Sequence, residues 1–335
     1  MAIKLIAEIG QAHEGSLGIA HSYIDALARS GVDVVKFQTH IAHAESSLNE
    51  SFRVNFSYED MSRYDYWKRM EFTPEQWVGL KLHCEEVGVE FVSSPFSMEA
   101  VDLLEKLGVK RFKIGSGETQ NYLMLEHIAK TGKEIWLSSG MSSVYELEET
   151  LDVLKEYGNS IVLFQCTTEY PTNPETWGLN VISELQNKFG LDIGFSDHSG
   201  DIFACLAAAS LGAQFLEFHA VFDKQMFGPD SKASLDLIQI KQLVSGVKQI
   251  QLALENPVDK NLVEQYSSSK MLFGKSLSAR FDLDQGEVLT EAVLETKKPA
   301  NLGILAKNYK LFIGKKVNKN IRAGEFINEE DIINE

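Results

Sequence analysis

The sequence predicts an α/β fold, a (β/α)8 TIM barrel followed by a small C-terminal domain. Between residue 3 and about residue 250 of the 335-residue chain, short apolar runs alternate with longer amphipathic segments. The alternation occurs eight times, which is the number of units that closes a parallel barrel. After residue 255 the pattern stops, and two short stretches that resemble each other follow.

The eight expected strands are rich in β-branched and aromatic residues, and each ends in polar residues. A strand that is buried on both faces of a parallel sheet gives such a continuous apolar run. The expected strands span residues 3–9, 32–38, 89–94, 110–116, 134–139, 161–166, 191–196 and 215–220.

The segments between these runs are expected to be helices. The clearest start signal is the capping box of Thr73 and Gln76. The other expected helices span residues 18–30, 98–107, 122–130, 144–157, 174–189, 202–211 and 237–254. Strict alternation implies a parallel sheet covered by helices. Because Gly10 and Gly15 do not form the Gly-x-Gly-x-x-Gly turn that is common in open sheets, a closed barrel is favoured.

Three parts of the chain are expected from these patterns. The barrel takes residues 1–255, and residues 256–275, which include Pro257 and a run of three serines, are expected to form a linker. Residues 276–335 should form the small domain. Within it, residues 279–289 resemble residues 317–327, and each half is expected to form two short strands joined by a turn at glycine.

The composition excludes several classes of partner. The formal net charge is −16, which argues against nucleic acid or an anionic membrane, because phosphate contacts need clustered Lys and Arg. Three widely spaced cysteines, Cys84, Cys166 and Cys205, favour neither a disulfide framework nor a zinc site and indicate a reducing compartment. Residues 1–8 do not resemble a signal peptide. The longest apolar run, 202–210, is about half of a membrane span. We therefore expect a cytoplasmic protein.

Polar residues at the ends of the expected strands are the candidate site, because barrels of this class carry their active sites at the C-terminal ends of the strands. In strand order these residues are Glu8; Lys36 and Gln38; Ser93 and Ser94; Lys113, Ser116 and Glu118; Ser138 and Ser139; Gln165, Cys166 and Thr168; Ser196, Asp197 and His198; and Glu217 and His219.

Two lysines dominate one part of this set. Lys36 and Lys113, with hydroxyl groups from neighbouring strand ends, suit a phosphate or carboxylate group. The hydroxyls are those of Ser94, Ser116 and Ser139. A Schiff-base lysine is the rival interpretation, and it requires an amine that burial or a nearby cation keeps deprotonated. The residue pattern alone leaves both interpretations open.

Two histidines lie at the ends of neighbouring expected strands. Strand ends in a sheet are about 5 Å apart, so His198 and His219 could bind one divalent metal ion that keeps positions open for water or substrate. Glu217 and Asp197 could be further ligands or could orient the imidazoles. The alternative is one structural and one catalytic histidine.

A series of motifs resembles a known family. IAEIGQAHEGS, VVKFQTH, SSPFS, FKIGSGE, QCTTEYP, GFSDHSG, LEFHAVFD and GPDSKASL occur in this order across the expected barrel. Together with the repetitive C-terminal part they resemble the sialic acid synthases, which comprise N-acetylneuraminate synthase and its legionaminate and pseudaminate relatives. The resemblance covers nearly the whole chain, and it implies that the C-terminal domain is antifreeze-like, with a β-clip fold.

The resemblance implies an enzyme that condenses phosphoenolpyruvate with an N-acyl mannosamine-type sugar and releases phosphate. It implies a divalent metal, Mn²⁺ first and Mg²⁺ or Co²⁺ as alternatives, and a domain-swapped homodimer. It also implies residue roles. The implied metal ligands are His198 and His219; the implied phosphoenolpyruvate site comprises Lys36, Lys113, Ser94, Ser116, Ser139 and Ser196; and the implied sugar-side or acid–base residues are Glu8, Gln38, Glu118, Tyr170 and Asp230.

The chemistry that the resemblance implies accounts for this set of residues. The metal would polarise the aldehyde oxygen of the open-chain sugar, and C3 of phosphoenolpyruvate would attack the aldehyde carbon. Glu118 would stabilise the cation-like C2 and orient the water that adds there, before phosphate leaves. No imine forms, so the lysines serve as anion anchors. The alternatives are a Schiff-base aldolase or lyase that acts on a sialic-type acid, and a non-catalytic carbohydrate-binding protein.

The sequence departs from the family pattern at four places. Ala12 precedes His13 where the family usually has Asn, Phe218 replaces a basic residue, and Thr168 replaces an Asn near the end of strand six. Lys298-Pro299 replaces an Arg-Pro whose Arg reads the acyl end of the sugar in the partner subunit, and Lys lacks the bidentate geometry of Arg. The accepted sugar therefore stays open. The aromatic-rich stretch 39–73 is expected to be either a lid over the sugar or simple surface packing.

Overall fold

The computed structural model describes residues 2–52 and 58–333 and divides the chain into two compact units, Met1–Asn256 and Pro257–Glu335. Residues 53–57, which belong to the long stretch expected to form a lid or surface packing, lie outside the described residues.

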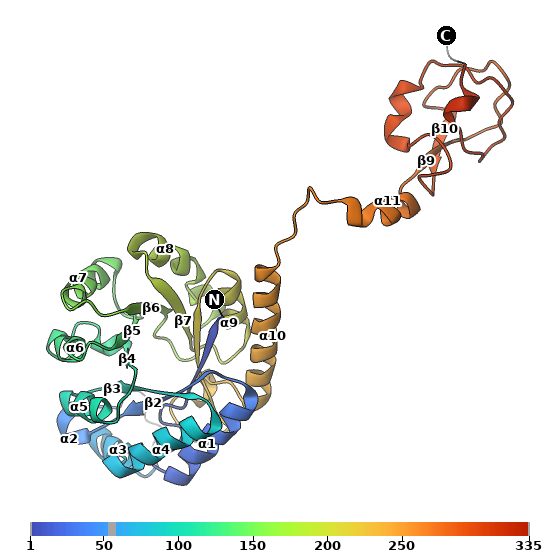
Figure 1. Ribbon diagram of the computed structural model, residues 1–335. Coiled ribbons are helices and arrows are strands. Elements are labelled where there is room, and N and C mark those ends of the chain that lie inside the picture. Colours follow the sequence, from blue (N-terminus) through green and yellow to red (C-terminus); the bar gives the residue numbers. More distant parts are fainter. Residues whose placement is uncertain (1, 53–57, 334–335) are drawn as a thin grey trace. The chain divides into compact units, whose positions relative to one another are not determined.

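The first unit is a nearly closed barrel of eight parallel strands (Figure 1). The hydrogen-bonded order is β3-β2-β1-β8-β7-β6-β5-β4. Consecutive strands therefore pair with each other, except that no ladder joins β3 to β4, and β1 also pairs with β8. All eight predicted strands are confirmed. They are β1 (Lys4–Glu8), β2 (Val34–Thr39), β3 (Glu90–Pro95), β4 (Arg111–Ile114), β5 (Glu134–Ser138), β6 (Ile161–Cys166), β7 (Asp192–Asp197) and β8 (Phe215–His219).

Eight helices of the predicted alternation surround this sheet (Figure 1). The capping box predicted at Thr73 is confirmed, because Gln76 N donates to Thr73 Oγ1 and Thr73 N donates to Gln76 Oε1. These helices are α1 (Leu17–Ser30), α4 (Pro74–Val87), α5 (Met98–Lys106), α6 (Tyr122–Ala129), α7 (Val144–Lys155), α8 (Leu179–Phe189), α9 (Phe203–Ser210) and α10 (Leu237–Glu255). The loops add the 3-10 turns η1 (Ser116–Glu118), η2 (Pro174–Thr176) and η3 (Ser231–Ala233).

Two helices of the first unit were not predicted, and both lie in the long segment that follows β2. They are α2 (Ala42–Glu45) and α3 (Arg63–Met70). Ser62 caps α3 by accepting a hydrogen bond from Asp65 N at 3.1 Å. Aromatic side chains of α3 pack with α2 in a small separate hydrophobic cluster. Tertiary packing, more than helical periodicity, stabilises this segment.

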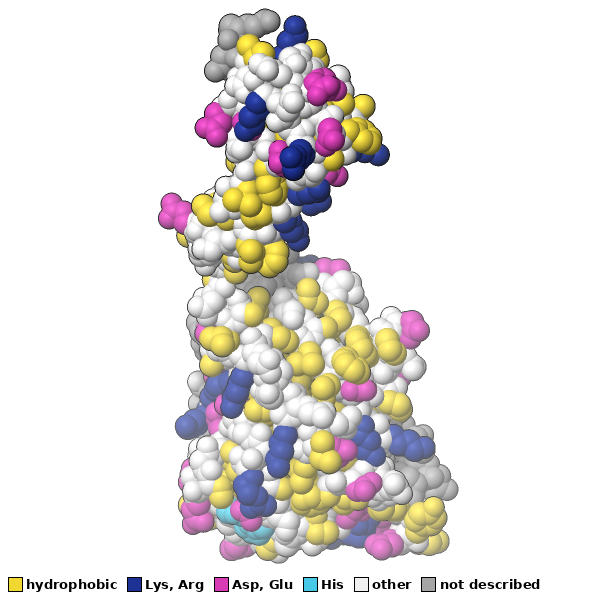
Figure 2. Space-filling model, turned by 90° about the vertical axis from the view of Figure 1, so that its right-hand side faces the viewer, with side chains coloured by type: hydrophobic (Ala, Val, Ile, Leu, Met, Phe, Trp, Pro, Cys, Tyr) yellow, Lys and Arg dark blue, Asp and Glu magenta, His cyan; other side chains and the backbone are white. Residues whose placement is uncertain are grey.

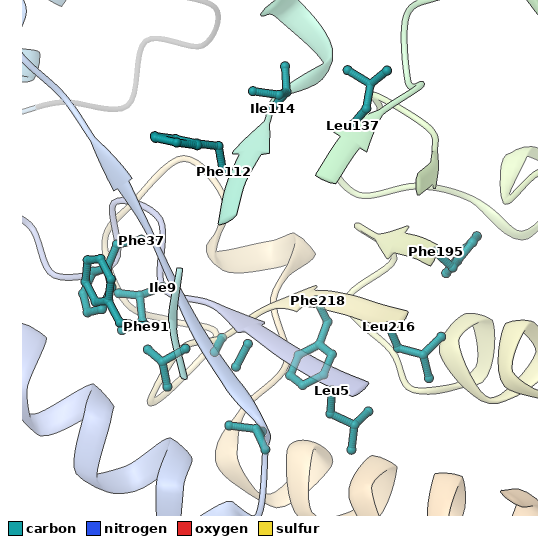
Figure 3. Close-up of a cluster of buried hydrophobic side chains, with 14 of the residues drawn as sticks. Leu5, Ile9, Phe37, Phe91, Phe112, Ile114, Leu137, Phe195, Leu216 and Phe218 are labelled. Carbon is teal, nitrogen blue, oxygen red and sulfur yellow. The ribbon is translucent and has the colours of Figure 1, made fainter. Parts of the chain in front are cut away.

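Alternation along the strands separates two apolar regions. Outward side chains pack against the helices, as Figure 3 shows for Leu5, Leu216 and Phe218 on β1 and β8. Inward side chains at the start of the strands form a separate plug inside the barrel, made of Ile6, Val34, Val92, Trp136, Val162 and Phe164. Beyond this plug, toward the C-terminal ends of the strands, the next inward positions are polar. The sequence therefore gives the barrel an apolar base and a polar mouth.

The second unit has its own small core and confirms the internal similarity. Gly286 and Gly324 both have a φ of +87°, a left-handed conformation that suits glycine. Leu283 and Ile321 exchange two backbone hydrogen bonds of 2.8 and 2.9 Å, so the halves pair with each other through single bridges instead of each forming a regular two-stranded hairpin. The regular elements are α11 (Ser267–Phe273), which lies in the segment expected to be a linker, β9 (Ser276–Ala279), β10 (Leu294–Lys297), and the 3-10 turns η4 (Glu264–Tyr266), η5 (Ala306–Leu311) and η6 (Glu329–Asp331).

Charged side chains of both signs are interspersed with apolar ones over the face shown in Figure 2. Among the described residues, no helix combines the length and the apolar character needed to cross a membrane. The longest helix, α10, has 19 residues, but it is interrupted by charged and amide side chains.

Candidate active site

Four charged side chains form a layer directly above the apolar plug. Lys36 Nζ lies 2.5 Å from Glu8 Oε2 and 3.6 Å from Glu217 Oε1. Lys113 Nζ lies 3.5 Å from the same oxygen of Glu217. All four side chains are buried, and they come from β1, β2, β4 and β8. The strand ends thus bring both predicted lysines to one carboxylate.

The charges in this layer stabilise one another. Burial raises the pKa of Glu217, but Lys113 and Lys36 outweigh this effect and hold that pKa at about 2. Burial lowers the pKa of Lys36, but Glu217 and Glu8 outweigh it, so the net shift is upward. Burial raises the pKa of Glu8 and lowers that of Lys113. Lys36 is therefore held as an ammonium ion beside an ionised Glu217.

Hydroxyl groups extend this layer. Lys113 Nζ donates to Ser138 Oγ at 2.5 Å, and Ser196 Oγ donates to Glu217 Oε1 at 3.1 Å. Ser139, the predicted residue, instead donates to Gln165 Oε1 at 3.4 Å. Strand alternation could have identified Ser138, because it follows inward-facing Trp136 by two positions.

Two further predicted serines, Ser94 and Ser116, lie at the same rim. Ser94 is buried at the end of β3, in register with Gln38 of β2. Ser116 Oγ donates to Cys166 Sγ at 3.8 Å. The backbone of Gly140 approaches the Ser116 hydroxyl so closely that an added Cβ would lie 2.6 Å from it.

The two predicted histidines lie side by side. The ring centroids of His198 and His219 are 5.3 Å apart, and the Tyr170 ring lies 4.1 Å from that of His198. His198 Nδ1 is 3.0 Å from the carbonyl oxygen of Thr167. A carbonyl only accepts, so Nδ1 carries the proton and the Nε2 lone pair is available. His219 Nδ1 lies 3.9 Å from Asp230 Oδ2.

This pair fits a metal ion that is shared with water or substrate. Burial lowers the pKa of His219 to about 4, so its imidazole is neutral near pH 7, as a metal ligand must be. Asp197 is turned away, because its carboxylate accepts from Ser199 N at 3.0 Å and Ser199 Oγ at 2.9 Å. Within residues 2–52 and 58–333, no group of three or more His, Cys, Asp and Glu side chains could hold a metal ion. The candidate ligands among the described residues are therefore these two imidazoles.

A pocket of about 510 Å³ opens above the charged layer. Gln38 belongs to both regions, since it lines the pocket and its Nε2 donates to Glu8 Oε1 at 2.7 Å. Glu118 also lines the pocket, where burial raises the pKa of its carboxyl group and Asn121 Nδ2 donates to its Oε2 at 2.8 Å. Six predicted residues line this pocket: Gln38, Ser116, Glu118, Thr168, Tyr170 and Asp230.

Several pocket residues were not selected from the sequence. Gln11 comes from the turn framed by two glycines, and His40 follows the end of β2. His40 could have been found, because it follows Gln38 by two positions and therefore shares its direction. Four more come from the segment with the two unpredicted helices: Glu45, Glu50, Arg63 and Trp67.

The predicted substrate residue Lys298 belongs to the second unit. Its Nζ lies over the Phe273 ring, 5.3 Å from the centroid, and its peptide bond to Pro299 is cis.

Acid should destabilise the loop after β1 through His13. Gly15 N donates to His13 Nδ1 at 3.0 Å, and burial, with smaller effects of His40 and Arg69, lowers the pKa of His13 to about 3. The unfolded chain takes up this proton below pH 6.5 but the folded chain does not, so stability falls as the pH drops from about 6.5 toward 3, by up to roughly 1.4 kcal/mol per pH unit. Denaturant midpoints at pH 7 and pH 5 should therefore differ less in His13→Asn, whose amide oxygen can still accept from Gly15.

The exposed His43 supplies the control for this comparison, because its side chain is 59% exposed. His43→Asn should keep the pH dependence of the unmodified chain. Equal slopes for His13→Asn and the unmodified chain would show that His13 contributes nothing to this acid sensitivity.

Comparison with known proteins places these residues in a family context. The sequence model of the NeuB family matches residues 23–259, and that of the SAF domain matches residues 274–333. The N,N'-diacetyllegionaminic acid synthase of Campylobacter jejuni is 39% identical over 97% of this chain and 98% of its own length. The N-acetylneuraminate-9-phosphate synthase of Homo sapiens is 33% identical over 98% of this chain and 92% of its own length.

A solved structure shows the same architecture. The N-acetylneuraminic acid (sialic acid) synthetase of Leptospira borgpetersenii serovar Hardjo-bovis, in complex with citrate, superimposes with a TM-score of 0.71. The match covers 80% of this chain and 91% of the other, at 27% sequence identity. The resemblance seen in the motif series is therefore confirmed along the chain.

Proposed function

The chain belongs to the NeuB family of sialic acid synthase-type enzymes, and from this premise we propose that it condenses phosphoenolpyruvate with an N-acyl mannosamine-type sugar. The products are a sialic-type nonulosonic acid and inorganic phosphate. Relatives whose names specify legionaminic and N-acetylneuraminic acid products support the reaction class.

The observation that carries the proposal is the buried layer of Lys36 and Lys113 beneath a large pocket. Two cationic side chains in a buried site attract the phosphate and carboxylate groups of phosphoenolpyruvate. The pocket above them has the volume of a small-molecule site and is lined by amide, hydroxyl and carboxylate groups that suit a sugar. Anion and sugar would thus meet where the strands end.

The residues of this chain then have distinct roles. Lys36 and Lys113 hold the anion, and Ser138 and Ser196 fix Lys113 and Glu217. Glu118, whose carboxyl group has a raised pKa, is placed in the pocket to stabilise positive charge at C2 and to orient the water that adds there. His198 and His219 would hold the metal ion, which when bound polarises the aldehyde oxygen of the sugar.

A Schiff-base aldolase or lyase is the second candidate, and one observation favours it. Burial lowers the pKa of Lys113, as an amine nucleophile requires. Glu217, at 3.5 Å from its Nζ, opposes this by favouring the ammonium form. Borohydride reduction in the presence of pyruvate distinguishes the two, because only an imine is trapped as a covalent adduct.

Phosphate release tests the synthase directly. The reaction mixture combines phosphoenolpyruvate, Mn²⁺ and one sugar from a panel of N-acetylmannosamine, mannose, N-acetylmannosamine 6-phosphate and diacetamido-trideoxy hexoses. Release that requires phosphoenolpyruvate, sugar and metal together supports the proposal. Covalent trapping with pyruvate, without such release, supports the aldolase instead.

Within this panel, uncharged sugars should be preferred over the 6-phosphate. Among the described residues, the pocket lining includes four carboxylates, Glu45, Glu50, Glu118 and Asp230, and one guanidinium, that of Arg63, which lies 3.5 Å from Glu50. A sugar phosphate is an anion, so the excess of carboxylates in the pocket would repel it. We expect kcat/KM for N-acetylmannosamine to exceed that for its 6-phosphate at least about 10-fold, which corresponds to roughly 1.4 kcal/mol.

The ionic strength supplies the control for this preference. Added salt screens partly exposed charges, so the ratio should narrow between 0.05 and 0.5 M NaCl, concentrations chosen to bracket roughly physiological screening. Equal or faster turnover of the 6-phosphate would contradict the electrostatic argument.

Three further features belong to the proposal. Mn²⁺ is the proposed metal, with Mg²⁺ and Co²⁺ as alternatives, and metal analysis of the purified protein decides between them. A domain-swapped homodimer is the proposed assembly, which light scattering tests by molar mass. The cytoplasm, where phosphoenolpyruvate is made, is the proposed compartment.

A further inference from the structure

His40 is held on both faces at the wall of the pocket. Its ring stacks against Trp67 of α3 at a centroid distance of 4.0 Å and an interplanar angle of 20°. On the other face it stacks against Phe96, which follows β3, at 4.8 Å and 10°. The side chain is 2% exposed. The two aromatic rings therefore hold the His40 ring in one plane between them.

The edges of the His40 ring are held as well. Nδ1 lies 2.8 Å from Glu45 Oε1, and because a carboxylate oxygen accepts, Nδ1 is the donor. With the proton on Nδ1, Nε2 carries the lone pair of the neutral ring and accepts from Gln11 Nε2 at 3.3 Å, while Gln38 Oε1, itself an acceptor, lies 3.2 Å away. Glu45 thus fixes which edge of the imidazole points toward Gln38.

The carboxamide of Gln38 has one orientation that satisfies its neighbours. Its Nε2 donates to Glu8 Oε1 at 2.7 Å, so its Oε1 must face the opposite side. There it accepts from Gln11 Nε2 at 2.5 Å and lies beside His40 Nε2. A continuous line of contacts therefore joins Glu45 on α2, through His40 and Gln38, to Glu8 in the charged layer.

We propose that His40, oriented by Glu45, is a positioning residue that holds the Gln11 amide, and through it the Gln38 carboxamide, for the sugar substrate. The inference rests on the proposed function, because Gln38 lines the pocket in which the sugar would bind. His40 acts through Gln38 and not on the reacting atoms. Because the Trp67 ring stacks on the His40 ring, the same contact packs α3 against the wall of the pocket.

The test separates sugar use from anion binding. In His40→Ala, kcat/KM for the sugar should fall about 10- to 100-fold, the effect of losing a hydrogen bond within a charged network. Phosphoenolpyruvate binding, measured by titration calorimetry without sugar, should keep its Kd within about 2-fold, because Lys36 and Lys113 are not in contact with His40. His40→Gln, whose amide oxygen can replace Nε2 as the acceptor for Gln11, should recover part of the loss.

Glu45 and an exposed histidine complete the design. Glu45→Gln keeps an acceptor for Nδ1 and should lose less sugar kcat/KM than Glu45→Ala, which should resemble His40→Ala. His43→Ala, which removes an exposed imidazole 3.1 Å from Glu99, is the matched control and should have no effect.

Three results would overturn the inference. They are unchanged sugar kcat/KM in His40→Ala, a parallel loss of phosphoenolpyruvate affinity, and a His40→Gln variant no better than His40→Ala. If the unmodified chain releases no phosphate in the presence of both substrates, the proposed function fails and this inference fails with it. If the unmodified chain is active and His40→Ala is equally active, only the inference fails.

Discussion

Lys113→Met is expected to lower kcat/KM for phosphoenolpyruvate about 10²- to 10³-fold, the usual cost of removing one donor that stabilises charge in a buried site. Methionine preserves the length and apolar stem of the side chain but not the ammonium group. Lys113 is preferred to Lys36 for this test, because Lys36→Met would leave Glu8 and Glu217 buried together without their shared cation. After Lys113→Met, Glu217 still has Lys36 at 3.6 Å, so the fold should persist.

The measurement is the initial rate of phosphate release over a range of phosphoenolpyruvate concentrations. Lys155→Met is the matched control, because Lys155 is exposed on α7 and pairs only locally with Asp152 at 2.9 Å. Thermal melting of both variants shows whether Lys113→Met has lost structure. A folded Lys113→Met variant with kcat/KM within about 3-fold of the unmodified enzyme would remove the lysine from the anion site.

His198→Ala is expected to abolish metal-dependent turnover, with a loss of about 10²- to 10³-fold, because several kcal/mol of charge stabilisation at the aldehyde oxygen disappears. Calorimetric titration with Mn²⁺ alone should show affinity at least about 10-fold weaker, as one of the two imidazoles is missing. The same loss of turnover should follow when the unmodified enzyme is treated with a chelator, and added Mn²⁺ should restore it.

His127→Ala is the control for this variant. His127 is partly exposed and lies 2.7 Å from Asp102 on the outside of the barrel, so its removal should change neither Mn²⁺ affinity nor turnover. Full turnover of the unmodified enzyme after exhaustive chelation would refute the metal assignment. Equal Mn²⁺ affinity in His198→Ala would place the ion elsewhere.

The barrel could be predicted from the sequence because its strands are buried on both faces. Each strand is therefore a continuous apolar run that ends in polar residues, and this signal does not depend on distant contacts. The helix α3 has no such signal. Its sequence, RYDYWKRM, is polar and aromatic, and it is stabilised by packing of Tyr66, Trp67 and Met70 with Ala42. That packing exists only after the chain has folded.

The same distinction separates the site residues that could be predicted from those that could not. Lys36, Lys113, His198 and His219 could be found because the strands are in register and place their ends at one level. Gln11 could not be placed, because its position depends on its contact with Gln38. Alternation could have indicated His40, but its stacking on Trp67 across loops could not be predicted. The choice between Ser138 and Ser139 depended on which residue of an adjacent pair points inward, and the Trp136 position decides it in favour of Ser138 for the contact with Lys113.

The open seam of the barrel has a consequence for the anion site. The hydrogen-bonded order begins at β3 and ends at β4. Ser94 and Lys113 therefore lie on two strands that no ladder joins. Everywhere else in the sheet, backbone bonds fix the spacing between neighbouring strands. At this one seam the spacing is set by side-chain packing, so substitutions beneath β3 and β4 can change the distance between Ser94 and Lys113 in the proposed anion site without altering either residue.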